Sequence, residues 1–208
     1  MGWLLLLGVA VATALLLWVL KLPRMLWSFA AAAMMLGAAG YALQGAPGRP
    51  GRPAEPADRA IQIDPGIIEL RGAMMGRFTL ENAYFIAADA MLRAGETGSA
   101  VAVMQGAVRK YPQDSQLWTG LGTVLSLHNG GLVSPAARLA FDRAITLAPR
   151  HPAPPFFLGL ALANAGQYVE ARPFWARAVA LTPPALGYRA ELVGRLAELD
   201  RAIAAASR

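Results

Sequence analysis

The chain has 208 residues, of which 56% are hydrophobic and 15% charged, and its formal net charge is +6. The absence of cysteine excludes disulfides, thiolate metal sites, cysteine nucleophiles and covalent haem attachment through a C-x-x-C-H motif. The basic residues are scattered rather than clustered, so the positive charge does not indicate binding of nucleic acid.

Two long apolar segments open the chain. Residues 3–20 form a run of 18 without a charge, and residues 25–43 form a second run of 19. Each is close to the ~20 residues that a helix needs to cross ~30 Å of hydrocarbon. The short segment from Lys21 to Arg24 contains a proline and is expected to form the turn between two helices. Residues 1–43 are therefore predicted to be a membrane anchor of two transmembrane helices in the lipid bilayer.

Charge alone leaves the orientation of this hairpin open. Lys21 and Arg24 favour a cytoplasmic turn, whereas three arginines between residues 49 and 59 lie close to the second segment on the other side. Alternatively, Lys21 and Arg24 form the basic region of an internal signal sequence, with residues 25–40 as its apolar core and cleavage near Ala46. Every interpretation except an inverted hairpin places the C-terminal domain outside the cytoplasm.

A spacer and a short helix follow the apolar segments. Residues 44–56 contain four prolines and three glycines and show no apolar period, so residues 44–63 are predicted to be an extended linker. Asp64 then provides an N-cap and Pro65 a first-turn proline, which predicts a helix within residues 64–80. We expect this helix to cap the first repeat of the domain that follows.

Residues 81–185 repeat one helical-hairpin pattern three times, in copies at 81–114, 115–151 and 152–185. The three extra residues of the second copy fall in the turn from Asn129 to Pro135. The tetratricopeptide repeat has a typical order of residues. Its first helix carries a large residue and, one turn later, a pair of small ones; its second helix carries Ala, a large residue and Ala, and Pro follows. The pattern predicts an all-α protein, with three helix pairs in a superhelix behind the membrane anchor. It is carried by Tyr84, Ala87, Ala88, Met91, Gly95, Ala100, Met104, Ala107 and Pro112, by Trp118, Leu121, Gly122, Leu125, Ala137, Phe141, Ala144 and Pro149, and by Pro155, Leu158, Gly159, Leu162, Gly166, Tyr168, Ala171, Trp175, Ala178 and Pro183.

Residues 186–208 are expected to form a helix that closes the superhelix. Leu192, Leu196, Leu199 and Ile203 form one apolar stripe, while the charged residues lie mostly off it. A repeat array needs a terminal element of this kind, with one face for packing and one for solvent.

Most of the small and large apolar residues of the repeats are predicted to pack between helices. Gly122 and Gly159 are small where two helices cross closely. The rings of Trp118, Tyr168 and Trp175 are expected to fill the space between hairpins. Ligand binding must then come from other positions.

The first helix of each pair lines the concave face in this architecture, and its inward positions predict a groove for a peptide. Rings there can take an apolar side chain of the ligand, while amides and hydroxyls can bond its backbone. The predicted groove residues are Asn82, Phe85, Asp89, Arg93, Gln116, Thr119, Thr123, Leu127, Phe156, Leu160 and Asn164.

Motifs for catalysis are missing from the sequence. It contains no nucleophile elbow, phosphate loop or spacing of metal ligands. His128 and His151 fall in predicted turns, and neither has a second ligand at helical spacing. We therefore expect no enzyme activity, no cofactor and no metal site, and surface positions for both histidines.

The order of two short-looped apolar segments, a Pro/Gly spacer and three tetratricopeptide repeats resembles the cytochrome c biogenesis factors of the CycH (CcmI/NrfG-like) type of proteobacteria. The segment from Ala73 to Phe78, just before the first repeat, also resembles the corresponding part of that family. Members with two spans often carry a long cytoplasmic loop between them, where this chain has only the four residues from Lys21 to Arg24.

The resemblance implies a chaperone anchored in the bacterial inner membrane, with its repeat domain in the periplasm. There the domain would hold the C-terminal segment of apocytochrome c and present it to subunits of the haem lyase complex. The alternative is a structural adaptor that scaffolds a cell-envelope assembly through protein–protein contacts. The sequence leaves both functions open.

Overall fold

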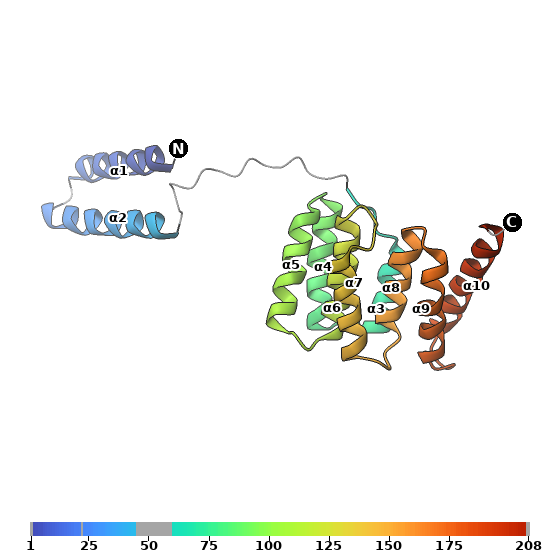
Figure 1. Cartoon of the computed structure of the whole chain (residues 1–208). Helices are drawn as coiled ribbons and strands as arrows, with labels where there is room; N and C mark the ends of the chain where they lie inside the picture. Colours follow the sequence, from blue (N-terminus) through green and yellow to red (C-terminus); the bar gives the residue numbers. More distant parts are fainter. Residues whose placement is uncertain (1, 22, 45–59, 207–208) are drawn as a thin grey trace. The chain divides into compact units, whose positions relative to one another are not determined.

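The computed structural model describes residues 2–21, 23–44 and 60–206. The chain divides into two compact units, Met1–Ala54 and Glu55–Arg208. All regular secondary structure of the described residues is α-helical, as the sequence predicts (Figure 1). Most of the predicted linker, with its arginines and the alternative cleavage point, lies outside the described residues.

The first unit is a hairpin of α1 (Gly2–Val19) and α2 (Arg24–Gln44), which lie side by side (Figure 1). Leu20 and Lys21 lie in the turn after α1, and the φ of Lys21, 49°, is in the left-handed region. Within the described parts of the chain, no helix is long and apolar enough to cross a membrane. The prediction of two transmembrane helices at 3–20 and 25–43 is therefore not supported.

Seven helices of the second unit build the repeats and their closing element, as the sequence predicts. Side chains of Thr79, Asp114 and Ser134 accept hydrogen bonds from backbone N–H groups in the first turns of three of them, which stabilises their starts. Consecutive helices pack against one another along the array. The helices are α4 (Leu80–Arg93), α5 (Thr97–Lys110), α6 (Ser115–His128), α7 (Pro135–Leu147), α8 (Ala153–Asn164), α9 (Tyr168–Leu181) and α10 (Arg189–Ala206).

The core follows the repeated small and large positions. A Cβ atom added at Gly122 would lie 2.8 Å from the ring of Phe141, and one at Gly159 would lie 2.4 Å from the indole of Trp175. The prediction that these glycines mark close crossings is confirmed. The alanines and large residues of the second helices are buried between the pairs: Ala100, Met104, Ala107, Ala137, Phe141, Ala144, Ala171, Trp175 and Ala178.

Two of the predicted packing rings lie further out than expected. Trp118 is only half-buried, because its indole N–H reaches back to the carbonyl of Pro112 at 2.9 Å, near the start of α6. Tyr168 is the first residue of α9 and is exposed. The prediction that the ring fills the space between hairpins is therefore wrong for Tyr168, whereas Trp118 still packs against the core with part of its ring exposed.

The closing helix α10 packs on α9 as expected. Leu192 and Leu199 are buried, and Leu196 and Ile203 pack against the same core. The stripe that the sequence predicts is thus the face that covers the last repeat.

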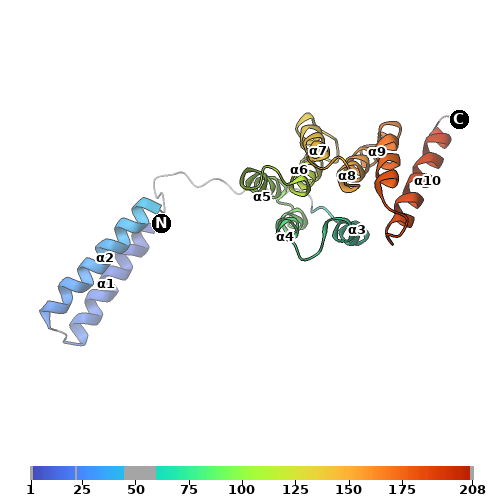
Figure 2. The same ribbon diagram turned by 90° about the horizontal axis from the view of Figure 1, so that it is seen from below.

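The short helix α3 (Pro65–Met75) begins as predicted, with the Asp64 carboxylate accepting the N–H of Gly66 at 2.9 Å. The sequence predicts that it caps the first repeat, and Arg71 of α3 pairs with Asp89 of that repeat. The helix lies on the inner side of the superhelix, beside α4 and in contact with α8, while α5, α7 and α9 form the outer layer (Figure 2). The residues that it buries are Leu70, Arg71, Met74 and Met75.

Candidate peptide-binding groove

Helix α3 lies on the inner face of the repeats, beside α4 (Figure 2). A cavity of about 40 Å³ remains between α3 and the groove wall. The lining is mainly apolar, with one carboxylate, one guanidinium and two hydroxyl groups. It comprises Phe85, Ala88, Asp89 and Leu92 of α4, Thr119, Gly120, Thr123, Val124 and Leu127 of α6, Phe157 of α8, and Ile63, Ile67, Arg71 and Met75 from α3 and the segment before it.

A buried ion pair joins α3 to the groove. Arg71 Nη1 donates to Asp89 Oδ1 at 3.2 Å, and Arg71 Nη2 donates to Asp89 Oδ2. Arg71 is 8% exposed and Asp89 is 4% exposed, so little water screens the two charges. The guanidinium also lies over the ring of Phe85, 4.7 Å from its centroid, in a cation–π contact.

Phe85 belongs to the groove but is not free to meet a ligand directly. Arg71 covers one side of its ring, and the ring also packs against α6 where Gly120 leaves room. A Cβ atom at Gly120 would lie 2.3 Å from this ring and 2.5 Å from the methyl group of Met104. The glycine therefore allows α4 and α6 to approach and sets the depth of the groove.

The threonines of α6 give the groove floor a weakly polar character. Thr119 Oγ1 donates to the carbonyl of Ser115 at 2.8 Å, and Thr123 Oγ1 donates to the carbonyl of Thr119 at 3.0 Å. Each hydroxyl hydrogen is thus used within the helix, and the oxygen lone pairs stay available as acceptors.

Both ends of the α3 segment are fastened to the repeats. Before the helix, the N–H of Ile61 donates to the carbonyl of Leu92 at 3.0 Å. At its end, the backbone of Met74 lies close enough to His151 to raise the pKa of that ring, and His151 Nδ1 accepts the N–H of Ala153 at 3.2 Å. Burial lowers the pKa of His151. His151 is thus partly buried in the turn between α7 and α8.

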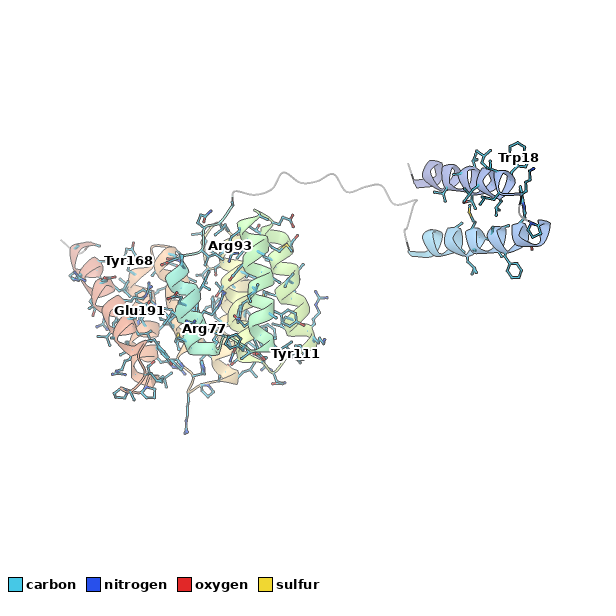
Figure 3. All side chains as sticks on the ribbon, turned by 180° about the vertical axis from the view of Figure 1, so that it is seen from behind. Trp18, Arg77, Arg93, Tyr111, Tyr168 and Glu191 are labelled. Atoms are coloured by element: carbon cyan, nitrogen blue, oxygen red, sulfur yellow. The ribbon has the colours of Figure 1, made fainter. Side chains whose placement is uncertain are left out.

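The remaining predicted residues lie at the groove ends or outside it. Asn82 Nδ2 donates to the carbonyl of Arg77 at 2.6 Å and so holds the turn between α3 and α4. Arg93 is exposed at the end of α4 (Figure 3), and Asn164 is exposed at the end of α8. Gln116 and Leu160 are partly buried.

Phe156 lies in the core instead of the groove. Its ring stacks on Trp175 with centroids 5.9 Å apart, and its neighbour Phe157 lines the groove. The inward position of α8 therefore differs by one residue from the predicted one. Nearly all of α8 is apolar, with Pro154 and Pro155 near its start, so apolar periodicity could not distinguish the two rings.

The sequence analysis did not identify α3 as part of the site. A signal was present, because Arg71 falls among Leu70, Met74 and Met75, on the face that proved to be buried. A single charge within an apolar helix face indicates a buried partner of opposite charge. That partner is Asp89.

Comparison with known proteins agrees with the repeat architecture. Residues 81–124 match the tetratricopeptide repeat. Superkiller protein 3 of Saccharomyces cerevisiae is 32% identical over 81 residues, which are 39% of this chain and only 5% of that protein. The type III secretion translocator chaperone SycD of Yersinia enterocolitica has a similar structure, with a TM-score of 0.46 and 17% identity over 62% of this chain and 90% of that one. The match covers the first repeat and the start of the second, and the helix pairs continue the same arrangement through residues 80–181. Stacked repeats of this type generally present extended surfaces for protein partners.

Proposed function

We propose that the chain is a membrane-anchored periplasmic chaperone in cytochrome c maturation. The groove holds the C-terminal segment of an apocytochrome c and presents it to subunits of the haem lyase complex. The order of apolar hairpin, Pro/Gly spacer and tetratricopeptide repeats supports the proposal through its resemblance to the CycH-type biogenesis factors.

The proposed location is the bacterial inner membrane, with the repeat domain in the periplasm. The α1–α2 hairpin supports it, because a surface so rich in apolar side chains calls for an apolar environment or partner. The large apolar side chains exposed there are Val9, Val11, Leu15, Leu16, Trp18, Val19, Leu20, Trp27, Phe29, Met35 and Leu36.

The observation that carries the function is that the groove accommodates an amphipathic helix. Leu70, Met74 and Met75 of α3 are buried in the unit, and Met75 lines the groove itself. A C-terminal apocytochrome segment that becomes helical offers an apolar face of the same kind.

Calorimetry with the full-length chain and a synthetic apocytochrome C-terminal peptide tests this function. The decisive pair of variants is Thr123→Arg and Thr146→Arg. Both threonines bond the carbonyl four residues earlier, but Thr123 lies on the groove floor and Thr146 is exposed on the outer helix α7. An arginine on the floor should weaken binding by ~2 kcal/mol or more, about thirtyfold.

The Thr146→Arg chain is the control and should bind like the parent. Helical circular dichroism must be the same in all three chains. Full-strength binding by the folded Thr123→Arg chain would remove the groove as the peptide site.

The outer face favours a second candidate, the structural adaptor. Trp118, Leu139, Asp142, Arg143 and Thr146 line an open hollow there, and Leu139 is exposed. A mixture of aromatic, arginine and apolar side chains is typical of contacts between folded proteins. The adaptor would be favoured if the parent chain retained apocytochrome and holocytochrome equally. The Thr146→Arg chain should then lose this retention, and the Thr123→Arg chain should keep it.

Reporter fusions test the location separately. A reporter that works only in the periplasm should be active after Arg208 and inactive when inserted between Pro23 and Arg24. The reverse pattern would exclude the chaperone function, because it would place the groove in the cytoplasm.

A further inference from the structure

Helix α3 contacts the groove in the manner of a bound peptide. It is only 11 residues long, and helices of this length are marginal in water on their own. Its helical form therefore depends on the surface that it covers. It is no part of the repeated helix pairs, and its residues Ile67, Arg71 and Met75 line one cavity together with residues of the inner helices of all three repeats.

These three contact residues are spaced by four. Ile67, Arg71 and Met75 consequently lie on one face of α3, one above the other along successive turns. The groove meets this face with apolar side chains at both ends and with Asp89 at its centre. Its shape and charge match an apolar residue, a cation and an apolar residue, each one turn apart.

The fit of α3 is incomplete. Among the described residues, Nε of Arg71 is buried without a hydrogen-bond partner, and the cavity of about 40 Å³ stays unfilled beside the helix. The attraction within a buried ion pair roughly equals the cost of removing its two charges from water. The Arg71–Asp89 pair therefore adds little to the strength of binding, and its main effect is on which helix can bind. A helix with the same pattern and a better fit can therefore compete with α3.

We propose that α3 is an internal ligand, displaced when the groove binds an amphipathic helix of a partner protein that carries Lys or Arg between two apolar residues, one turn away on either side. This rests on the proposed function only in taking the groove as the partner site. Docked α3 covers the apolar groove while no partner is present, which limits unspecific association. It also weakens partner binding, because the apparent dissociation constant is the intrinsic one divided by the fraction of chains with the groove open.

A single introduced cysteine can report displacement, because the chain has none of its own. Met75 is 6% exposed, whereas Glu69 on the same helix is exposed. In the full-length chain, Met75→Cys should react slowly with a maleimide and Glu69→Cys quickly. Excess synthetic peptide of residues 60–77 should accelerate labelling of Met75→Cys and leave Glu69→Cys unchanged. The same peptide with Glu at the position of Arg71 should have no effect.

Direct binding gives a second measurement. In the Arg71→Glu chain, a carboxylate would face Asp89, so α3 should leave the groove and the 60–77 peptide should bind on the order of tenfold tighter than to the parent. Asp89→Arg should abolish binding of this peptide and restore binding of the Glu-substituted one.

Two outcomes would overturn the proposal: fast labelling of Met75→Cys without peptide, or no peptide binding by an Arg71→Glu chain that keeps its helical circular dichroism. The proposed function fails differently. In that case the 60–77 peptide binds the opened groove, and the apocytochrome peptide binds neither the parent nor the Arg71→Glu chain.

Discussion

The indole N–H of Trp175 on α9 donates a hydrogen bond of 3.0 Å to the backbone carbonyl of Phe156 on α8, and the two rings stack. The same indole occupies the space above Gly159, where a Cβ atom would collide with it. Trp175 thus joins the two helices of the third repeat by a polar bond, a ring contact and a close crossing.

Replacing Trp175 by alanine should therefore destabilise the chain strongly. Removing a large buried ring typically costs about 3–5 kcal/mol, and a three-repeat array has few interfaces to share the loss. Trp118→Ala is the matched control, because that ring is half-exposed, and its loss should cost much less. Urea unfolding of both variants measures the difference. Equal losses would contradict the packing described for these two rings.

Gly120 should tolerate no side chain. An alanine methyl there would press on Phe85 and Met104, and overpacking of this kind typically costs about 1–3 kcal/mol. Gly106 on α5 is also helical but has no neighbouring atom within 4 Å of an added Cβ. Gly106→Ala should be neutral or stabilise by up to about 1 kcal/mol, since alanine favours the helix. A shift of the thermal midpoint in the same direction for both variants would be incompatible with the close contact at Gly120.

The helix pairs were predictable from the sequence because their determinants are local. Asp114 and Ser134 cap their helices through neighbouring backbone groups, and Gly122 and Gly159 keep the repeat spacing. Each such signal lies within a few residues or recurs in another copy. The site depended on contacts that no local pattern encodes, above all the docking of α3.

Arg172 illustrates the same limit on the outer surface. The periodicity of α9 indicates an outward position, and the side chain is indeed exposed. Its Nε nevertheless donates to Asp200 on α10 at 2.7 Å, a partner 28 residues further along the chain. Pairing over such a distance follows from how the closing helix packs, so the sequence alone could not predict it.

Acid should destabilise the folded chain through His151. Burial lowers the pKa of this ring from its ordinary value near 6.5, and the nearby backbone of Met74 opposes the change only in part. The folded state therefore disfavours the protonated ring. Its contribution to stability is complete above the ordinary pKa and is lost as the pH falls through the lowered one.

The free energy of unfolding of the parent should accordingly fall between about pH 7 and about pH 5 more steeply than that of His151→Gln. Urea unfolding at both pH values gives the two slopes. Identical slopes would show that protonation of His151 is not linked to folding.

The Arg71–Asp89 pair should respond very differently to the removal of one charge and of both. Asp89→Leu leaves the guanidinium buried without its carboxylate, and a lost partner of this kind typically costs about 3–5 kcal/mol. Because α3 is outside the repeated pairs, part of that cost can be avoided if the helix undocks and Arg71 returns to water.

Asp89→Leu combined with Arg71→Met places apolar groups on both sides, where replacement of an ion pair is often neutral or stabilising. Urea unfolding should thus show the double variant at least as stable as the parent, and thiol labelling at position 75 should show α3 docked only in the double variant. A double variant less stable than Asp89→Leu would mean that the pair itself, and not the cost of an unpaired charge, holds α3 in the groove.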